Sequence, residues 1–205
     1  KLNGLDAIKF TKRDLTEELT NSAMNKPYDN PNSFGKTYGE HRAYLEFDDE
    51  THYRLYKYVK EIGLDYVITL TSLKCASIFK LFKPDKLKVA SRDLTNLPLL
   101  KMLAETQIPI IISTGMSGKD ELDQAISMIN KYHDNISILH CVSQYPTEYK
   151  NVNLLTINYL KKHYQEYTIG YSDHTIGIST AVSAVAMGAK IIEKHITLDR
   201  TMKGT

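Results

Sequence analysis

Short apolar runs alternate with longer amphipathic stretches along most of the chain. Several of the short runs are apolar at nearly every position and rich in β-branched residues, as in parallel strands that are covered on both faces. This pattern predicts strands at 6–10, 66–70, 87–91, 109–113, 136–142, 167–171 and 190–196. Apolar residues recurring three and four apart predict helices at 49–62, 97–105, 117–132, 153–164 and 179–187.

The order of these elements predicts the fold class. From the third strand onward, successive strands end roughly every 21 to 29 residues, which is the length of one βα unit. Repeated βα units predict a parallel sheet, and we expect an α/β fold of the (β/α)8 TIM-barrel type. Lys1–Gly4 has the pattern of a helix C-terminus capped by Gly4, so we expect a first strand and helix to precede the chain. We therefore interpret residues 1–205 as strands 2–8 of one catalytic barrel, in a piece of a longer protein.

The connection between the first two predicted strands is unusually long and rich in turn formers and aromatic residues. Connections of this length are usually functional or disordered. We predict that residues 20–45 form a long active-site loop or lid, with an exposed, mobile loop as the alternative. Its candidate substrate contacts are Tyr38, Glu40, His41 and Arg42.

Composition and charge narrow the class of protein. Apolar residues make up 42% of the chain and charged residues 24%, which is ordinary for a soluble globular protein. The net charge of +2 gives no basis for binding nucleic acid or a membrane surface. No apolar run approaches the ~20 residues of a membrane span. Cys75 and Cys141 lie in no metal-ligand spacing, and we expect free thiols and a cytoplasmic protein.

Polar side chains gather where the predicted strands end, which is where barrels of this kind carry their active sites. Lys9 and Lys88 each interrupt an apolar strand, so a solvated surface lysine is the weaker interpretation. Hydroxyl groups follow at Ser91, Ser113 and Ser172. The turn at 113–118 leads into a helix N-terminus, whose free N–H groups favour a phosphate or carboxylate. Together these features predict a site for a small anion.

Two histidines belong to the last two predicted strands. His174 follows the strand at 167–171, and His195 lies within the strand at 190–196. Adjacent strands can bring two imidazoles onto one divalent ion, and mixed nitrogen and oxygen ligation suits manganese, iron, cobalt or zinc. A pair of core histidines is the alternative, and the spacing alone leaves both open. His140 and Cys141 are expected to be core residues.

Six motifs in a fixed order cover nearly the whole chain. They lie at 6–10, 88–99, 112–116, 140–146, 170–177 and 192–199. The pairing of Ser-Asp-His-Thr at 172–175 with Glu-Lys-His at 193–195 is highly specific. On these motifs the chain resembles the catalytic barrel of the sialic acid synthase family, the NeuB-like enzymes.

The resemblance implies an N-acetylneuraminate synthase-like transferase. Such an enzyme condenses phosphoenolpyruvate with an N-acetylated hexosamine, an amino sugar, to give a sialic-type (nonulosonic) acid and phosphate. It implies that His174 and His195 bind a divalent metal, usually Mn2+, with Mg2+ or Co2+ as alternatives. The implied phosphoenolpyruvate contacts are Lys9, Lys88, Ser91, Ser113 and Ser172. Further implied substrate contacts are Ser143 and Tyr145, and the implied catalytic residues are Asp93 and Lys88.

The resemblance also implies parts that lie outside this chain. They are strand 1 and a C-terminal antifreeze-like domain, which supplies an arginine to a partner's sugar site. The full-length enzyme is then expected to be a cytoplasmic homodimer, and residues 1–205 alone are expected to have little or no activity.

Departures from the family pattern leave the acceptor sugar open. Arg92 stands where a small residue is common, Ser143 replaces an asparagine, and 70–72 lacks a usual acid. A sibling synthase for legionaminic, pseudaminic or spore-coat sugar acids is therefore an alternative. Two others are a Schiff-base aldolase that uses Lys88 or Lys194, and a non-catalytic barrel that binds a sugar phosphate.

Overall fold

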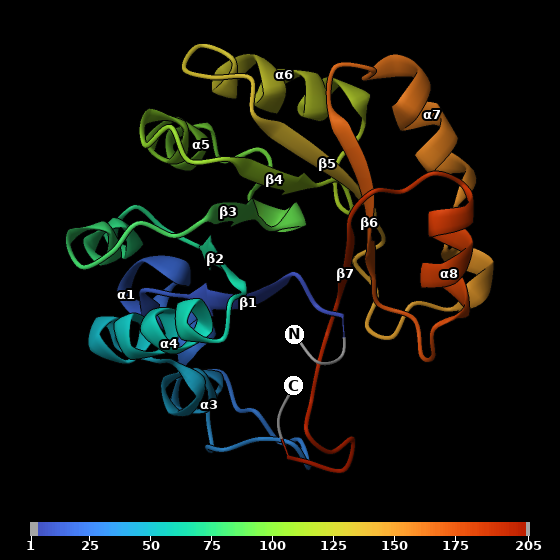
Figure 1. The fold of residues 1–205 in the computed structure, drawn as a ribbon. Coiled ribbons are helices and arrows are strands. Elements are labelled where there is room, and N and C mark those ends of the chain that lie inside the picture. The colour runs from blue at the N-terminus through green and yellow to red at the C-terminus, as the bar shows by residue number, and fades with distance from the viewer. Residues whose placement is uncertain (1–3, 204–205) are drawn as a thin grey trace. The chain divides into compact units, whose positions relative to one another are not determined.

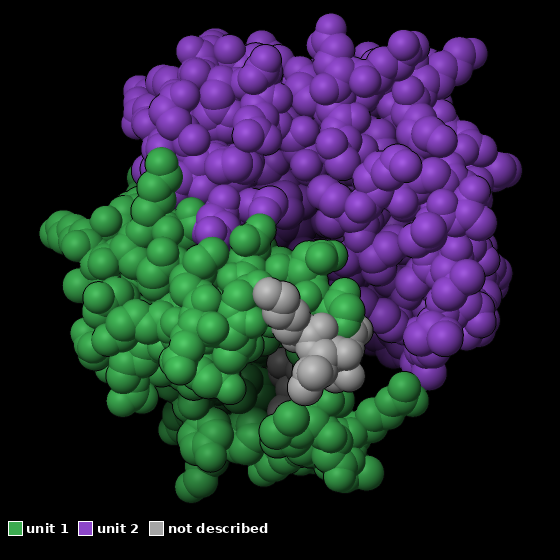
Figure 2. Space-filling model, in the orientation of Figure 1, with its two compact units in different colours: residues 1–84, 196–205 green, residues 85–195 purple. Residues whose placement is uncertain are grey.

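A computed structural model of the protein describes residues 4–203, which form two compact units. Among the described residues, unit 1 comprises 4–84 and 196–203, and unit 2 comprises 85–195; Figure 2 colours them separately. Each unit combines parallel strands with helices, which confirms the α/β class.

Unit 2 holds a parallel sheet whose strands are paired in chain order. Its strands are β3 (Lys86–Val89), β4 (Ile110–Ser113), β5 (Ile136–Cys141), β6 (Thr168–Asp173) and β7 (Ile192–Lys194). Its helices are α5 (Leu97–Glu105), α6 (Lys119–Ile129), α7 (Leu155–His163), α8 (Ser179–Ala186) and the 3-10 turns η2 (Ser91–Asp93) and η3 (Tyr149–Asn151). Figure 1 shows α5 to α8 on the outer side of these strands.

The sequence explains why these strands are central. Ile110, Ile111 and Ile112 of β4 are all buried, as expected for a parallel strand whose two faces are both covered. Helix α5 begins after Asn96, whose side chain accepts a hydrogen bond from Leu99 N, and it carries Pro98 in its first turn. The sheet of unit 2 therefore follows from its apolar strands and from local helix signals.

Unit 1 pairs β1 (Ala7–Lys12) in parallel with β2 (Asp65–Leu70). Its helices are α1 (Leu15–Glu18), α2 (Asn21–Met24), α3 (Tyr38–Leu45), α4 (Asp49–Glu61) and η1 (Lys74–Lys80). Aromatic rings fill its core: Tyr66 contacts Phe10, Tyr56 and Phe82 within 5.7 Å between ring centroids.

Most predicted elements are confirmed, with two corrections. Strand β7 ends at Lys194, so His195 lies one residue beyond the strand instead of within it, because pairing with β6 stops at that point. Residues 20–45 contain the whole of α2 and of α3 and are therefore not one continuous loop. Thr37 and Glu40 form the capping box that begins α3. A role of this segment as a lid stays a prediction.

The complete (β/α)8 barrel also stays a prediction. Residues 1–3 of the expected leading helix end lie outside the described residues, while Gly4 has the positive φ, 74°, of a helix-capping glycine. Within residues 4–203, no helix is both long and apolar enough to span a lipid bilayer.

Candidate active site

Lys88 on β3 is the centre of a buried polar cluster in unit 2. Its side chain is only 3% exposed, and Nζ donates to Ser113 Oγ on β4 at 2.6 Å and to the Val89 carbonyl at 2.8 Å. The carboxylate of Glu193 on β7 lies 3.9 Å from Nζ. A buried ammonium group is stable only with such partners, so this strand end is built to hold charge.

A small cradle lies around Gly115, directly after β4. The Gly115 N–H donates to Ser91 Oγ at 3.0 Å. A methyl group on Gly115 would lie 2.6 Å from Ser143 Oγ, 2.9 Å from Cys141 Sγ and 2.9 Å from Ser91 Oγ. Two hydroxyls and a thiol therefore converge on one point that only glycine leaves open.

Strand alternation sorts the residues of β6 and β7 onto opposite faces. Ser172 is in register with Glu193, and its hydroxyl donates to the Glu193 carboxylate at 2.8 Å. Asp173 is in register with Lys194, whose Nζ donates to Asp173 Oδ2 at 2.6 Å. Thus Ser172 and Glu193 share the face of Lys88, whereas Asp173 and Lys194 turn toward α8.

His174 and His195 lie side by side at the ends of β6 and β7. Their ring centroids are 5.3 Å apart in an edge-on arrangement, and the Tyr145 ring lies 4.2 Å from that of His174 and 5.9 Å from that of His195. His174 Nδ1 lies 3.0 Å from the Val142 carbonyl. Because a carbonyl oxygen only accepts, Nδ1 carries the proton and Nε2 of the neutral ring keeps its lone pair.

The pKa shifts reflect this dense packing. Burial lowers the pKa of His174, but the Cys141 thiol and the Val142 carbonyl raise it more, so the net shift is upward. Burial raises the pKa of Cys141, yet hydrogen bonds from His174 and Ser91 bring it below its ordinary value. Burial likewise raises the pKa of Asp173, and the hydrogen bond from Lys194 reverses that effect. The pKa of Tyr145 is raised by burial and by the nearby charges of Cys141 and Glu193.

The donor set fits a divalent ion held by two imidazoles. Among residues 4–203, no three His, Cys, Asp or Glu side chains are grouped closely enough to hold a metal. The described residues would thus contribute two imidazoles to such an ion and leave its other positions open, for example to water or substrate oxygens.

Most of the predicted site residues come together in unit 2. Ser91, Ser113, Ser143 and Ser172 lie around Lys88 and the Gly115 cradle. Asp93 lies in η2 and pairs with Arg92 at 3.3 Å. Lys9 lies on β1 of unit 1 and is exposed, so its place among the anion contacts stays a prediction.

The expected anion site at the start of α6 needs a correction. Gly118 N, at the N-cap of this helix, donates to the Glu121 carboxylate at 2.9 Å. The helix thus supplies its own anion, and Asp120 adds further negative charge to the first turn. The N–H that faces other residues of the site is instead that of Gly115.

Sequence reasoning assigned no role to Glu193, Asp173 or Gly115, and it predicted Cys141 only as a core residue. The sequence names Glu193 only as part of a motif and Lys194 also as the Schiff-base lysine of the aldolase alternative, and their opposite faces become clear from the register of β6 and β7. A signal was present, however: a strand ending Glu-Lys-His beside one ending Ser-Asp places an acid opposite a lysine for one choice of register.

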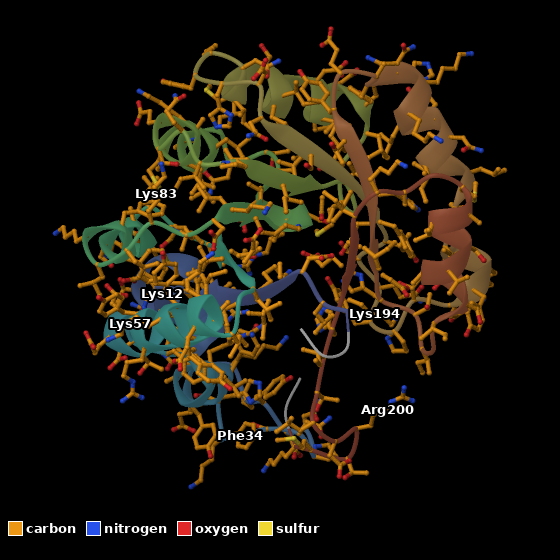
Figure 3. The ribbon with its side chains drawn as sticks, in the orientation of Figure 1. Lys12, Phe34, Lys57, Lys83, Lys194 and Arg200 are labelled. Carbon is orange, nitrogen blue, oxygen red and sulfur yellow. The ribbon has the colours of Figure 1, made fainter. Side chains whose placement is uncertain are left out.

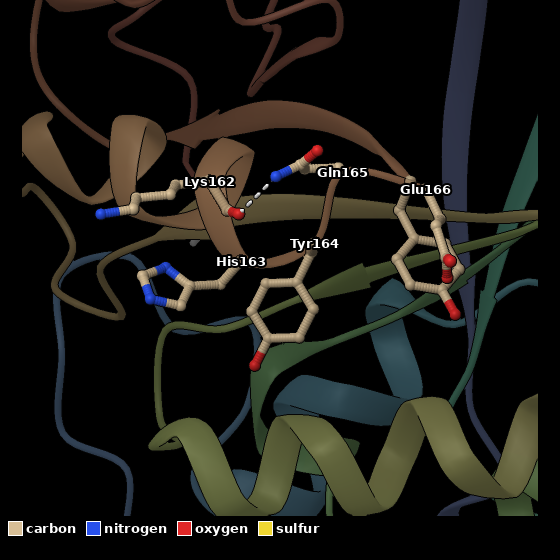
Figure 4. A pocket seen from close by; sticks show the side chains of 6 residues that line it. Lys162, His163, Tyr164, Gln165 and Glu166 are labelled. Atoms are coloured by element: carbon tan, nitrogen blue, oxygen red, sulfur yellow. Dashed lines mark hydrogen bonds between the residues drawn. The ribbon is translucent and has the colours of Figure 1, made fainter.

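A hollow at the other end of β6 holds none of the predicted site residues. It is lined by residues 162–167, between α7 and β6. Figure 4 shows its side chains and the hydrogen bond from Gln165 to the Lys162 carbonyl, 3.1 Å long. It lies at the amino end of the strand, whereas the polar cluster lies at the carboxyl ends, as expected for a parallel α/β protein.

Comparison with known proteins decides the family. The NeuB family model matches residues 1–205. The chain belongs to the NeuB family. A human relative, N-acetylneuraminate-9-phosphate synthase, is 36% identical over 98% of this chain and 56% of its own length. N,N'-diacetyllegionaminic acid synthase of Legionella pneumophila is 34% identical over 100% of the chain and 59% of its own length.

A solved structure supports this membership. The sialic acid synthetase of Leptospira borgpetersenii, in complex with citrate, has a TM-score of 0.83 and 32% identity, and the match covers 97% of this chain and 65% of that one. This NeuB chain thus spans little more than half the length of relatives such as the human enzyme. Both the human and the Legionella relatives are named as synthases of sialic-type acids.

Proposed function

We propose that the full-length protein condenses phosphoenolpyruvate with an N-acetylated hexosamine to give a nonulosonic acid and phosphate. The observation that carries this proposal is the buried ammonium and hydroxyl cluster of Lys88 and Ser113, which lies in the same unit as two adjacent imidazoles. The ammonium and hydroxyl cluster is suited to an anion. The imidazoles are suited to a cation that would bind the aldehyde oxygen of the acceptor.

The anionic substrate fits the charge and the donors of the cluster. Phosphoenolpyruvate carries a carboxylate and a phosphate, and both favour lysine ammonium and hydroxyl donors. Lys88 supplies the positive charge, and Ser91, Ser113 and Ser172 supply hydroxyls. We infer that the anion displaces part of the existing pairing around Lys88, since a buried charge requires a partner in both states.

His174 and His195 would hold the divalent cation, Mn2+ being the first choice and Mg2+ or Co2+ the alternatives. When bound, the ion would supply Lewis acidity toward the aldehyde oxygen of the open-chain sugar. The Val142 carbonyl orients the imidazole of His174, and Tyr145 packs against both rings.

The condensation balances without any redox partner. The electron pair of the phosphoenolpyruvate double bond forms a bond from its methylene carbon to the aldehyde carbon, and the carbonyl electron pair moves to the aldehyde oxygen, which takes up a proton. Water adds to the second carbon of phosphoenolpyruvate, which the broken double bond has left electron-deficient, and loses a proton. The bond between that carbon and the phosphate oxygen then breaks, which releases phosphate. Lys88 positions the anion, where orientation is worth ~7–11 kcal/mol at most. Asp93 is the proposed group that guides the proton lost by water.

The aldolase alternative has weaker support. Lys194 donates to Asp173 and to the Thr175 carbonyl, and these bonds direct its nitrogen away from Ser172. A Schiff-base lysine must reach the carbonyl carbon of its substrate, and the nitrogen of Lys194 is instead engaged with these two groups. We also expect the full-length enzyme to be a cytoplasmic homodimer, which sedimentation analysis of the purified protein would test.

The decisive experiment measures phosphate release by the full-length protein. Phosphoenolpyruvate and Mn2+ are supplied with a panel of N-acetylated hexosamines, each with and without a phosphate group, because some relatives are named as 9-phosphate synthases. We expect release with at least one sugar and its loss on adding a chelator. No release above background with any sugar would refute the proposal. Covalent trapping by borohydride with pyruvate would favour the aldolase.

A further inference from the structure

The residues beside the two histidines form an ion pair on the opposite face of the strands, in which the carboxylate is buried and the ammonium group is partly exposed. Lys194 Nζ lies 2.6 Å from Asp173 Oδ2, and the Asp173 side chain is completely buried. Lys194 lies on β7 and is labelled in Figure 3. Neither residue contacts the polar cluster around Lys88, since Ser172 and Glu193 occupy the face of the strands that carries this cluster.

The ion pair holds the chain on both sides of His174. Asp173 Oδ1 accepts from the Thr175 N–H at 2.9 Å, which closes a turn around the histidine. Lys194 Nζ donates at the same time to the Thr175 carbonyl at 2.8 Å. One ammonium group therefore bridges the residue before His174 and the residue after it.

The Asp173 carboxylate is also fixed from the helix side. The Thr180 hydroxyl on α8 donates to Oδ2 at 3.1 Å, and the Tyr171 hydroxyl donates to Oδ1 at 3.2 Å. A buried carboxylate with this many donors has little freedom to move. The position of Lys194, and of its chain neighbour His195, is consequently tied to the turn that carries His174.

We propose that the Lys194–Asp173 ion pair is a clamp that sets the separation of His174 and His195 for a shared divalent cation. This inference rests on the proposed function, because it concerns the same pair of imidazoles. Asp173 and Lys194 act as positioning residues: they touch neither the cation nor the substrates. Groups that orient metal ligands typically contribute about 10- to 100-fold to metal affinity.

The test uses Co2+ as the probe and the metal-free full-length protein. Its dissociation constant and its visible absorption are measured for the wild type, for Lys194→Met, and for the double variant Asp173→Asn/Lys194→Met. The double variant removes both charges and so leaves no buried charge unpaired. The control is Lys101→Met/Glu105→Gln, which removes an exposed ion pair on α5. All titrations are made where circular dichroism shows each variant to be folded.

We expect both clamp variants to bind Co2+ about 10- to 100-fold more weakly, with altered absorption bands, and the control to match the wild type. The double variant should regain much of the thermal stability that Lys194→Met loses, without regaining affinity. If the ion pair were only structural, its removal would change the melting temperature but not the dissociation constant for Co2+. Wild-type affinity for Co2+ in the double variant would therefore overturn the clamp. If the wild type bound no Co2+, the clamp and the metal site would be overturned together. Phosphate release that persists with chelator would then show that the condensation survives as the part of the proposed function that needs no metal.

Discussion

Two histidines from different units experience opposite environments. His52, on α4 of unit 1, is fully buried beside Phe10 and Phe47, and burial together with Lys12 lowers its pKa to about 4. His174, at the end of β6, is half-buried, and its pKa is raised. Burial lowers the pKa of both rings; at His52 the charge of Lys12 adds to this effect, whereas at His174 the Cys141 thiol and the Val142 carbonyl outweigh it.

A carbonyl partner alone does not identify a metal ligand. His140 Nε2 also meets a carbonyl, that of Val152 at 2.7 Å, but its ring is buried and stacked on Tyr171. His174 differs because the rings of Tyr145 and His195 meet it at the exposed end of the strands. His174 is thus the candidate ligand, with a fixed proton on one nitrogen and a lone pair on the other, as the hydrogen-bond partners of metal-binding histidines provide.

The largest expected effect comes from removing His174, the unit 2 histidine of this comparison. His174→Ala in the full-length protein should lower metal-dependent phosphate release by roughly 10²–10³-fold or more, because several kcal/mol of Lewis-acid stabilisation is lost. The matched control is His163→Ala, an exposed histidine of the same unit. Release rates at saturating Mn2+ check the prediction, and equal rates for the wild type and His174→Ala would remove the metal assignment.

The second effect concerns the pH dependence of folding stability that His52 of unit 1 causes. The folded-state pKa of His52, about 4, lies below the ordinary value of 6.5, so its neutral form stabilises the fold fully above pH 6.5. That stabilisation is lost as pH falls from 6.5 toward 4 and amounts to about 3 kcal/mol. We expect His52→Leu to lose this part of the acid sensitivity.

Urea unfolding at pH 7 and pH 4.5 measures this contribution. The difference in unfolding free energy between the two pH values should be smaller in His52→Leu than in the wild type. His163→Gln, at an exposed position, serves as the control and should keep the wild-type difference. An unchanged difference in His52→Leu would show that other groups dominate the acid sensitivity.

The same contrast explains how much the sequence predicts. The strands of unit 2 are predictable because β-branched runs such as Ile110–Ile112 can only be buried. Helix α3 was missed because its apolar residues have no helical period; a capping box and the stacking of Phe34 on Tyr44 and on His41 accompany it. Local hydrogen bonds and aromatic contacts thus replace the hydrophobic periodicity on which the prediction relied.

The site was predictable as a set of residues but not as an arrangement. Lys88, Ser113 and Ser172 stand out because each places a polar group in an apolar strand. The opposite faces of Glu193 and Lys194 depend on the register of β6 and β7, and a shift of one residue exchanges the two faces. Chain pattern therefore identifies reactive groups, whereas register decides which of them meet.

The third prediction tests the cradle of unit 2 by adding a methyl group at Gly115. Gly115→Ala would place a methyl group within 2.9 Å of Ser91 Oγ, Cys141 Sγ and Ser143 Oγ. These groups must shift, and displacements of this size cost up to about 10²-fold in turnover. We expect kcat/KM for phosphoenolpyruvate to fall by roughly 10- to 100-fold. Gly118→Ala, which meets only the flexible end of Glu121 at 3.1 Å, should leave kcat/KM near the wild-type value.

The smallest expected effect concerns the acceptor sugar. The guanidinium of Arg92 pairs with Asp93 at 3.3 Å, and its side chain is 41% exposed. At such an exposed position, a contact to a sugar phosphate is worth about 0.2–1 kcal/mol. Arg92→Ala should therefore raise KM for a phosphorylated acceptor by about 1.4- to 5-fold. KM for the sugar without phosphate should stay unchanged, and Arg92→Lys should retain most of the effect of the charge. An equal rise in KM for both sugars would place the action of Arg92 on Asp93, and the acceptor phosphate would then need another partner.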